Sequence, residues 1–500
     1  MSKINKIGPI YVAAFLFVLF GVFAFLTYNY TGAYGDLAEY LNNPLRVLNG
    51  ELPYRDFWLL FPPGEVMLPA FLYRIFGLNV NVLLSALALI HGFIGMLAFL
   101  AGKKLFDDNL KAVLLAVLMF FLGVNHVYIL PLLLALMFFA DRRNFWVGVF
   151  VGLAFYFRFF VGGAAAAAFF LSILLRDRLK GALLYSLGGF LAVLLVYAPL
   201  YGIWPDIWQA VVWDSLQHGT SMNLPYFVEA GARLHDFKVS LGNGNVFDIL
   251  YQFGRAGVTV LLYLLPFLVG TMSVFYLSGK GSNKLRGMVF FFFMWMFFAF
   301  FKALGRSDIS HLVHALTPAL FLLVFFLGVK GFRLLSSALI ALLLIQVLLN
   351  LWSQIKLLTE PSYEVSTEYG SLKLDDKEEA EALKNVLDTI LAETDEGDYI
   401  FVDFWDASPI YALTNRMNPT YYDSLIDFVA RPLDEKQEKL CADLLEFKPK
   451  FVVHNAQWMF DGKEEFKFEN AAPILVECVE ENFELVGEWD DYSLYKVVEN

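Results

Sequence analysis

Charged residues are scarce in this chain of 500 residues. They make up 17% of the sequence, against about 25% in a typical soluble protein, whereas hydrophobic residues make up 58%. A soluble protein of this size could not bury so many apolar side chains, but a lipid bilayer can surround them. The lysines and arginines occur in twos and threes and form no basic patch for nucleic acid. The composition predicts an integral membrane protein with the lipid bilayer, and no nucleic acid, as a partner.

Cysteine is nearly absent. Cys441 and Cys478 are the two cysteines of the chain, and their spacing matches no CxxC or Cys/His zinc pattern. The simpler expectation is two unpaired cysteines in a hydrophobic core. The alternative is a disulfide bond, if this part of the chain faces an oxidising compartment.

The N-terminus resembles a signal peptide, but we do not expect it to be cleaved. Lys3 and Lys6 precede an apolar run from Ile7 to Thr27, which is long for a signal sequence, and no small-x-small cleavage site follows it. We expect this run to be a first transmembrane helix that is retained.

Apolar runs alternate with short polar links and predict about eleven transmembrane helices. Two pairs of runs, within 110–140 and 145–175, allow only about 15 residues per crossing where roughly 20 are needed. These four helices are expected to be short, tilted or partly re-entrant. The predicted spans are 7–28, 79–101, 110–123, 126–140, 145–159, 161–175, 182–201, 257–278, 287–302, 312–328 and 333–352.

Every second link is rich in Lys and Arg, which orients the chain. These links contain four acids, Asp107, Asp108, Asp141 and Asp177, and their excess of positive charge predicts a cytoplasmic location. The N-terminus is then cytoplasmic, and an odd number of crossings places the C-terminal part outside the cytoplasm. We expect a multi-pass protein of the plasma (inner) membrane. The cytoplasmic links are 1–6, 102–111, 141–144, 176–181, 279–286 and 329–333.

The sequence changes character near Lys356, which predicts two domains, 1–355 in the membrane and 356–500 outside it. Strand patterns at 398–403 and 450–454 alternate with helix patterns at 375–395, 409–413, 435–446 and 472–482. A hairpin is predicted from 483–489 and 492–498. This order is typical of a small α/β domain. Asp403, Trp405 and Asp406 follow a strand, where a helix cap and turn explain them as well as a site does.

The first outer loop, 29–78, contains the most informative polar residues. Asp36 lies about eight residues beyond the first helix, and Glu39 follows it. A carboxylate at the membrane interface can act as a general base on a hydroxyl; the alternative is that it is simply solvated. Asp56 is a second candidate carboxylate, which could bind a metal or the acceptor.

The same loop predicts a helix. Pro62 and Pro63 suit a helix start, and the mostly apolar helix 63–76 is expected to lie in the membrane interface.

Cationic residues gather at the predicted outer end of two later helices. Lys302, Arg306 and His311 lie in or next to the link 303–311, and such a cluster suits a lipid phosphate. The alternative for Lys302 and Arg306 is that they extend their charges to the membrane surface. Arg158 is isolated in an apolar run, where a charge is costly and often functional; it would pair with a phosphate or extend outward.

The second large outer loop, 202–256, carries aromatic and acidic residues. Residues 204–213 contain three tryptophans and predict an interfacial helix. A divalent cation is a possible cofactor here. The candidates match no known metal pattern, however, so no metal ligand is assigned: Asp214, His218, His235 and Asp236.

The first-loop motifs resemble the GT-C glycosyltransferases, multi-spanning enzymes that use lipid-phosphate-linked sugars. The resemblance is to the branch of protein O-mannosyltransferases and lipid A aminoarabinose transferases. Members carry an acidic motif after the first helix, a Gly-x-x-Pro-Tyr-x-Asp-like stretch, and a Pro-Pro pair opening a helix that ends in Phe-Gly. Where some relatives have a second adjacent acid, this chain has Leu37. The matching residues are Asp36, Gly50 with Pro53-Tyr54-Arg55-Asp56, Pro62-Pro63 and Phe76-Gly77.

The resemblance implies a transferase that moves a sugar from a polyprenyl-phosphate donor to a hydroxyl of a glycan, glycolipid or protein, inverting the anomeric centre. Asp36 would be the catalytic base. Two other classes stay open: a lipid or glycan transporter or flippase, although no repeat relates the two halves, and a non-catalytic membrane scaffold. The residues assigned to substrate binding are Glu39, Tyr54, Asp56, Glu65, Arg158, Lys302, Arg306 and His311.

Overall fold

A computed structural model provides the fold and divides the chain into two compact units. A helical unit contains Met1–Ala24, Ala88–Ile203 and Met222–Lys356. An α/β unit contains Phe25–Leu87 and Leu357–Asn500, together with Trp204–Ser221. The first outer loop and the C-terminal segment therefore belong to the same unit. The structure describes residues 8–28, 37–59, 62–124, 126–203, 226–243, 245–279, 282–305, 308–403, 408–422, 434–456, 464 and 467–498.

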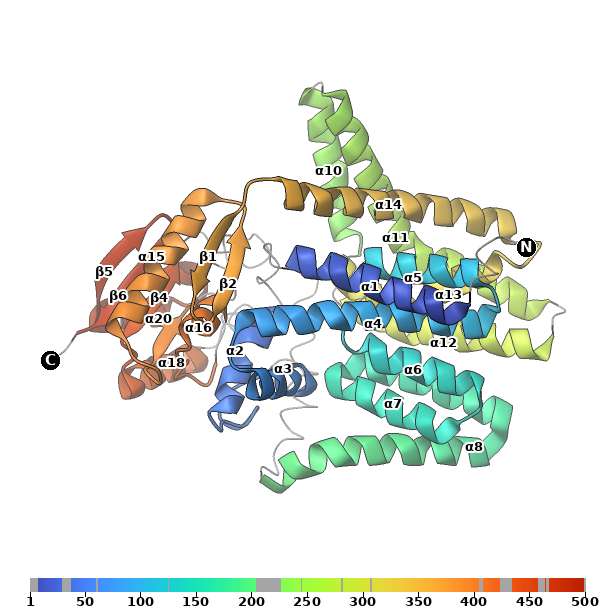
Figure 1. The fold of residues 1–500 in the computed structure, drawn as a ribbon, viewed down its shortest axis with the longest axis horizontal. Helices are drawn as coiled ribbons and strands as arrows, with labels where there is room; N and C mark the ends of the chain where they lie inside the picture. Colours follow the sequence, from blue (N-terminus) through green and yellow to red (C-terminus); the bar gives the residue numbers. More distant parts are fainter. Residues whose placement is uncertain are drawn as a thin grey trace. The chain divides into compact units, whose positions relative to one another are not determined.

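The helical unit confirms a polytopic membrane fold (Figure 1). Each of the eleven predicted spans contains a helix among the described residues. The span pair 161–175 and 182–201 falls in one long helix, α8, that is interrupted at Arg178 (φ 57°, ψ −162°). The helices are α1 (Pro9–Tyr28), α4 (Val80–Phe106), α5 (Asn109–Phe121), α6 (Ile129–Ala140), α7 (Asn144–Phe157), α8 (Phe159–Ile203), α10 (Val228–Asn243), α11 (Val246–Ser278), α12 (Asn283–Gly305), α13 (Ile309–Phe326) and α14 (Arg333–Thr359).

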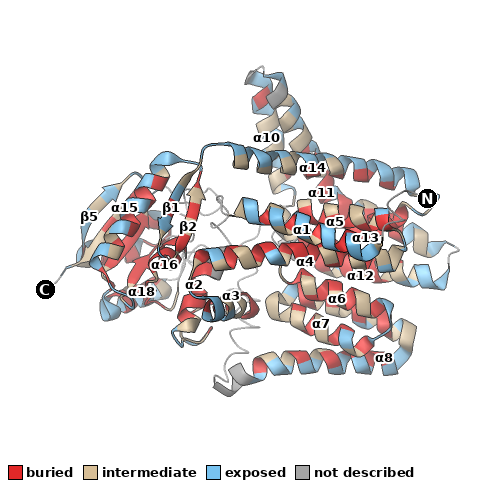
Figure 2. Ribbon diagram, viewed as in Figure 1, coloured by how far each residue is buried: buried red, intermediate tan, exposed pale blue. Residues whose placement is uncertain are grey.

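Six of the described helices are long and apolar enough to cross a bilayer, and the others are short. Helices α5, α6 and α7 have 13, 12 and 14 residues. At 1.5 Å per residue each extends about 20 Å, less than the roughly 30 Å of hydrocarbon. Helices α1, α8 and α14 have many exposed residues (Figure 2). Large apolar side chains such as Phe15, Leu195 and Leu348 are among them. Only a lipid environment makes such exposure favourable.

Glycines let helices α7 and α8 pack closely. A Cβ atom on Gly148 would lie 2.0 Å from the carbonyl oxygen of Tyr185, and one on Gly188 would lie 2.1 Å from the carbonyl oxygen of Phe145. Small residues at such contacts let two membrane helices approach through their backbones. This contact joins α7 to the part of α8 that follows the break at Arg178.

Three of the links predicted to be cytoplasmic lie together. Lys104 pairs with Asp141, with Nζ 2.5 Å from Oδ2. Asp177 in turn contacts Arg142, with Oδ1 3.8 Å from Nη1, and accepts a hydrogen bond from Asn144 at 3.0 Å. The links 102–111, 141–144 and 176–181 therefore share one end of the helical unit, as the alternating charge pattern requires.

The C-terminal part of the α/β unit has a four-stranded sheet of order β3-β4-β6-β5. Strands β3 (Ile400–Val402) and β4 (Phe451–Asn455) are parallel, whereas β5 (Phe483–Trp489) and β6 (Tyr492–Val497) form the predicted antiparallel hairpin. Its core includes Phe401, Leu444, Val452 and Leu475. The helices are α15 (Lys377–Glu393), α16 (Ser408–Thr414), α18 (Asp434–Phe447), α19 (Phe468–Ala471) and α20 (Pro473–Asn482).

Two features of this unit were not predicted. A separate hairpin, β1 (Tyr363–Thr367) with β2 (Gly370–Leu374), precedes α15. In the first loop, α2 (Leu37–Leu48) precedes the predicted helix α3 (Gly64–Phe76). Helix α3 buries Val66 and Tyr73 and exposes Phe71 and Phe76, so it has the apolar outer face of an interfacial helix.

The expectation of two unpaired cysteines was wrong. Cys441 on α18 and Cys478 on α20 form a disulfide bond, with their Cα atoms 6.0 Å apart. The two helices pack side by side over the sheet, and their facing positions bring the thiols together. Spacing in the sequence carries no such information, because it does not reveal which helices pack against each other.

Candidate functional site

The first outer loop folds into a helix, a tight turn and a second helix. In the turn, the backbone N–H of Tyr54 donates to the carbonyl oxygen of Phe57 at 2.7 Å, and Asp56 Oδ2 accepts from the N–H of Leu52 at 2.8 Å. Arg55 donates to both carboxylate oxygens of Asp56, at 2.8 and 2.6 Å. This hydrogen bonding holds the pKa of Asp56 below its usual value. The turn thus keeps Asp56 ionised and beside a guanidinium group.

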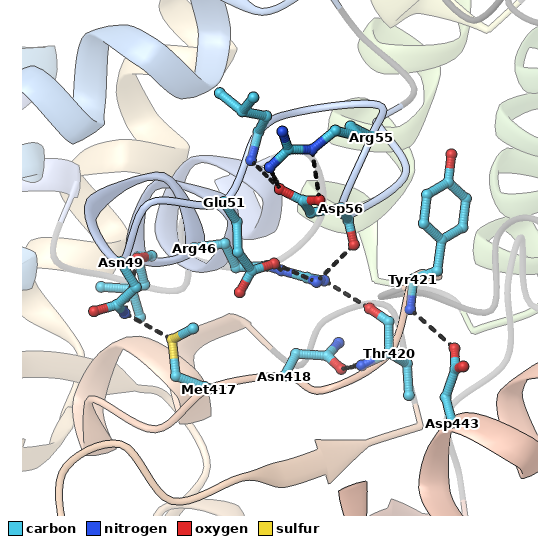
Figure 3. A network of polar contacts seen from close by, with 12 residues as sticks. Arg46, Asn49, Glu51, Arg55, Asp56, Met417, Asn418, Thr420, Tyr421 and Asp443 are labelled. Carbon is cyan, nitrogen blue, oxygen red and sulfur yellow. Dashed lines mark hydrogen bonds and ion pairs between the residues drawn. The ribbon is translucent and has the colours of Figure 1, made fainter. Parts of the chain in front are cut away.

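This turn is joined to the segment 416–422 of the same unit (Figure 3). The N–H of Trp58 donates to the carbonyl oxygen of Tyr421 at 2.8 Å. The Tyr421 hydroxyl donates to the carbonyl oxygen of Tyr54 at 3.0 Å, and Asp443 on α18 accepts from the Tyr421 N–H at 3.2 Å. Hydrogen bonds thus connect the first outer loop directly to the C-terminal segment 416–422.

The predicted catalytic residue, Asp36, lies outside the described residues, and it directly precedes α2 in the sequence. Glu39 lies in the first turn of α2, but its side chain is also outside the described part of the chain. Tyr54 is buried in the turn, and Glu65 is buried in the first turn of α3. The roles assigned to these residues stay predictions.

A second polar cluster lies in the helical unit, at the start of α13. Asp308 caps this helix: its Oδ1 accepts from the N–H of His311 at 2.9 Å and lies 2.6 Å from His311 Nδ1. One turn later, Nδ1 of the buried His314 lies 2.6 Å from the Tyr128 hydroxyl. The ring of His126 stacks on Tyr128, with centroids 5.3 Å apart. Three imidazoles therefore gather between α13 and the segment before α6.

The other predicted cations of the helical unit are placed only in part. The Lys302 side chain and Arg306 lie outside the described residues. Arg158 ends α7 in an extended conformation (φ −148°, ψ 107°), with its N–H bonded to the carbonyl oxygen of Ala154. It therefore lies between the end of α7 and the start of α8.

A third cluster lies at the carboxyl ends of the parallel strands β3 and β4. His454 Nδ1 lies 2.7 Å from Asp403 Oδ2, and His454 Nε2 lies 3.3 Å from Glu469 Oε1. Burial alone would lower the pKa of His454, but the two carboxylates outweigh it and raise the pKa to about 9. Contact with the two carboxylates therefore favours the charged form of this imidazole in the folded protein.

Comparison with known proteins supports a fold assignment. No protein-family model and no curated protein sequence matches this chain. The crystal structure of ArnT from Cupriavidus metallidurans bound to undecaprenyl phosphate matches over 98% of both chains, with a TM-score of 0.55 and 13% identity. The chain has a GT-C fold. A second match is the archaeal oligosaccharyltransferase AglB from Archaeoglobus fulgidus, in complex with an inhibitory peptide and a dolichol-phosphate. It has a TM-score of 0.48 and 13% identity, and the match covers 100% of this chain and 75% of that chain. The fold assignment rests on the ArnT match alone.

In this GT-C fold, several of the interacting residues were not predicted from the sequence. Arg46 was missed because α2 was not predicted, although an arginine in a last helical turn is a familiar signal. Asp308 stands three residues before His311, the spacing of an N-cap. Tyr128 and His126 lie between two short helices, and no local pattern links them to His314.

A divalent cation at the residues considered stays a prediction. Among the described ranges, no three His, Cys, Asp or Glu side chains lie close enough to hold a metal ion. Asp56 already receives the guanidinium of Arg55, which would repel a cation. Asp236 on α10 pairs with Arg233, while Asp214 and His218 lie outside the described part of the chain.

Proposed function

We propose that this chain is a membrane glycosyltransferase that takes its sugar from a polyprenyl-phosphate donor. The observation that carries the proposal is the GT-C fold, shared along nearly the full length of ArnT. The ArnT structure contains undecaprenyl phosphate, which makes a polyprenyl phosphate the first ligand to test. The acceptor is a hydroxyl of a glycan, glycolipid or protein.

The reaction follows from the residues assigned to it. Asp36 removes the proton of the acceptor hydroxyl, and the oxygen attacks the anomeric carbon. The bond from that carbon to the phosphate oxygen breaks, so the polyprenyl phosphate leaves with the bonding electrons. This direct displacement inverts the anomeric centre. The negative charge on the departing phosphate calls for cations, and we assign that role to Arg158, Lys302, Arg306 and His311.

The acceptor side is assigned to the α/β unit. We place Glu39, Tyr54, Asp56 and Glu65 around the acceptor, and we take residues 356–500 to be an extracytoplasmic domain. The Cys441–Cys478 disulfide supports this orientation, because structural disulfides form in oxidising compartments. The positive links that lie together at one end of the helical unit agree with it.

Two measurements test the proposal. In nanodiscs, native mass spectrometry compares binding of undecaprenyl phosphate with binding of undecaprenol, which lacks the phosphate; we expect only the phosphate form to bind. The protein is then mixed with undecaprenyl-phosphate-linked radiolabelled hexoses, pentoses and aminopentoses, with solubilised membranes of the source cells as acceptor. Label that enters the acceptor as undecaprenyl phosphate is released supports a transferase.

The same preparation separates the other two classes. Movement of intact undecaprenyl-phosphate sugar between vesicle leaflets, without release of undecaprenyl phosphate, would favour a flippase. Binding of neither lipid would favour a scaffold.

A further inference from the structure

Helix α11 begins well before the membrane span predicted for it. It has 33 residues and is about 50 Å long at 1.5 Å per residue, whereas the hydrocarbon layer is about 30 Å thick. The part that precedes the predicted span, 246–256, packs against α10, and the ring centroids of Phe237 and Phe253 lie 5.5 Å apart between the two helices. We call the two segments 228–243 and 246–256 the α10–α11 hairpin.

The base of this hairpin is anchored in the helical unit. The hydroxyl of Tyr226, just before α10, donates to the carbonyl oxygen of Tyr263 in α11 at 2.7 Å. Glu229, in the first turn of α10, accepts from the N–H of Ile309, the first residue of α13, at 3.1 Å. From this base the hairpin projects beyond α14 and crosses the direction of α14 steeply (Figure 1). Because α14 is long and apolar enough to span a bilayer, the hairpin runs closer to the membrane plane than to its normal.

A contact with α14 indicates the depth of the hairpin in the membrane. A Cβ atom added to Gly254 would lie 3.5 Å from Cδ1 of Leu349, so this part of α11 lies against α14. Leu349 is close to the end of the predicted span 333–352. Nearby in the sequence, Leu348 and Trp352 are 63% and 62% exposed, and tryptophan favours the boundary between hydrocarbon and headgroups. The hairpin therefore lies at the level where α14 leaves the hydrocarbon layer.

The exposed face of α11 continues from the membrane span into the hairpin. Exposed positions recur along the helix at alternating intervals of four and three residues, which keeps them on one side. Within the span, this side has apolar residues that only lipid can cover. The exposed apolar residues on this side are Leu264, Phe267 and Val274 in the span and Val246, Leu250 and Phe253 in the hairpin.

Helix α10 has an amphipathic exposed side. Leu234 and Leu241 are 50% and 53% exposed and lie about two helical turns apart, with the exposed Lys238 between them. Lysine beside exposed leucines is typical of helices at a membrane surface. Its flexible stem lets the ammonium reach the lipid phosphates while the apolar side chains enter the lipid.

We infer that the α10–α11 hairpin is a membrane-interface arm whose exposed apolar side chains insert among the phospholipids where α14 leaves the bilayer. The partner is the phospholipid bilayer, because the exposed face of the hairpin continues the lipid-facing side of α11. In water, the exposure of Val246, Leu250 and Phe253 would be unfavourable, and insertion into lipid removes that cost.

Fluorescence quenching by phospholipids tests the inference in the full-length chain, with one chain in each nanodisc. Leu250→Cys and Phe253→Cys are each labelled with bimane; the native cysteines form a disulfide bond and do not react. The controls are Leu348→Cys on the lipid-facing side of α14 and Lys384→Cys, exposed on α15 of the α/β unit.

Phosphatidylcholine with a nitroxide near the headgroup end of its acyl chain is the quencher. We expect it to quench both hairpin labels to at least about half the extent seen at 348, as for a helix embedded in the interface, and to leave the label at 384 unquenched. Quenching at 250 and 253 as weak as at 384 would overturn the inference.

Nanodiscs that hold two chains separate the bilayer from a second copy of the protein as the partner. The quenching at 250 and 253 should be the same as with one chain. Protection of both labels in the two-chain nanodiscs would mean that a second copy covers this face, and the inference would fail.

A matched pair of substitutions gives a second readout that needs no label. Leu250→Glu places a carboxylate on the exposed face of the hairpin, and Leu445→Glu places one at a leucine of α18 that is 44% exposed. In nanodiscs at pH 8, Leu250→Glu should lower the unfolding temperature by about 2–4 °C, because a charge in lipid is costly, whereas Leu445→Glu should leave it unchanged. A wild-type unfolding temperature for Leu250→Glu would contradict the inference. If this variant does not fold, the quenching measurement decides.

Discussion

His454 and Asp403 are 51 residues apart in the sequence, yet His454 Nδ1 lies 2.7 Å from Asp403 Oδ2. Parallel pairing of β3 with β4 creates this contact, because Val402 pairs with Val453 and each polar residue follows directly. Only 1% of the Asp403 side chain is exposed. The ion pair therefore connects the two parallel strands at their carboxyl ends.

This ion pair predicts a pH-dependent stability. The pKa of His454 is raised from 6.5 to about 9 in the folded state, so the imidazolium stabilises the fold in full below pH 6.5, and the stabilisation is lost as pH rises through 9. His454→Asn keeps a hydrogen-bond donor but no charge. Thermal unfolding in detergent should show the wild type more stable at pH 6, by up to about 3 kcal/mol, and a shrinking difference toward pH 10.

The control for this measurement is His235→Asn, which changes an exposed histidine on α10. Because this side chain is exposed, the substitution should change stability little. A difference for His454→Asn that is constant between pH 6 and 10 would mean that the imidazole is not charged in the folded protein.

The close packing of α7 on α8 predicts intolerance of a single methyl group. Gly148→Ala would place a Cβ 2.0 Å from the Tyr185 carbonyl oxygen, so the helices must separate, at a cost of about 1–3 kcal/mol. Gly163→Ala, in the same pair of helices, meets nothing within 4 Å and should be neutral or slightly stabilising. Thermal unfolding followed by size-exclusion chromatography compares the two. Equal loss in both variants would refute the proposed contact.

The disulfide predicts both stability and location. Cys441 and Cys478 close a loop of 37 residues, so its loss should destabilise the α/β unit by about 3–4 kcal/mol. The double variant Cys441→Ser/Cys478→Ser should unfold at a lower temperature than the wild type, and reductant should shift only the wild type. In intact cells, a membrane-impermeant maleimide should add to two thiols only after reduction. Labelling without reductant would contradict the bond.

The membrane fold was largely predictable. The lengths of the apolar runs indicate the helices, and the charges of the links between them indicate which links lie at the same end. The N-cap of α5 at Asp108, whose side chain accepts from the N–H groups of Leu110 and Lys111, also follows from a local rule. The strands around Phe401 and Val452 carry clear buried patterns. The β1–β2 hairpin was missed because its five-residue strands lie beside a longer polar helix pattern that dominates the region.

The contacts that organise the candidate site were not predictable from one sequence. Arg46 meets Thr420, and Tyr54 meets Tyr421, across more than 360 residues. Acceptors in these contacts are backbone carbonyl groups, which every residue type provides. No side-chain pattern therefore signals them. The expectation of unpaired cysteines was wrong for another reason, because spacing in the sequence does not show that α18 packs against α20.

We propose that Asp36 is the base of a polyprenyl-phosphate-dependent glycosyl transfer. Its most direct test is the single-turnover transfer rate of Asp36→Asn, which keeps the shape of the side chain and removes its basicity. The matched control is Asp107→Asn, in a predicted cytoplasmic link, where 96% of the side chain is exposed. We predict a rate at least about a hundredfold lower for Asp36→Asn, with unchanged binding of undecaprenyl phosphate and a control that matches the wild type. A wild-type transfer rate in Asp36→Asn would contradict the account.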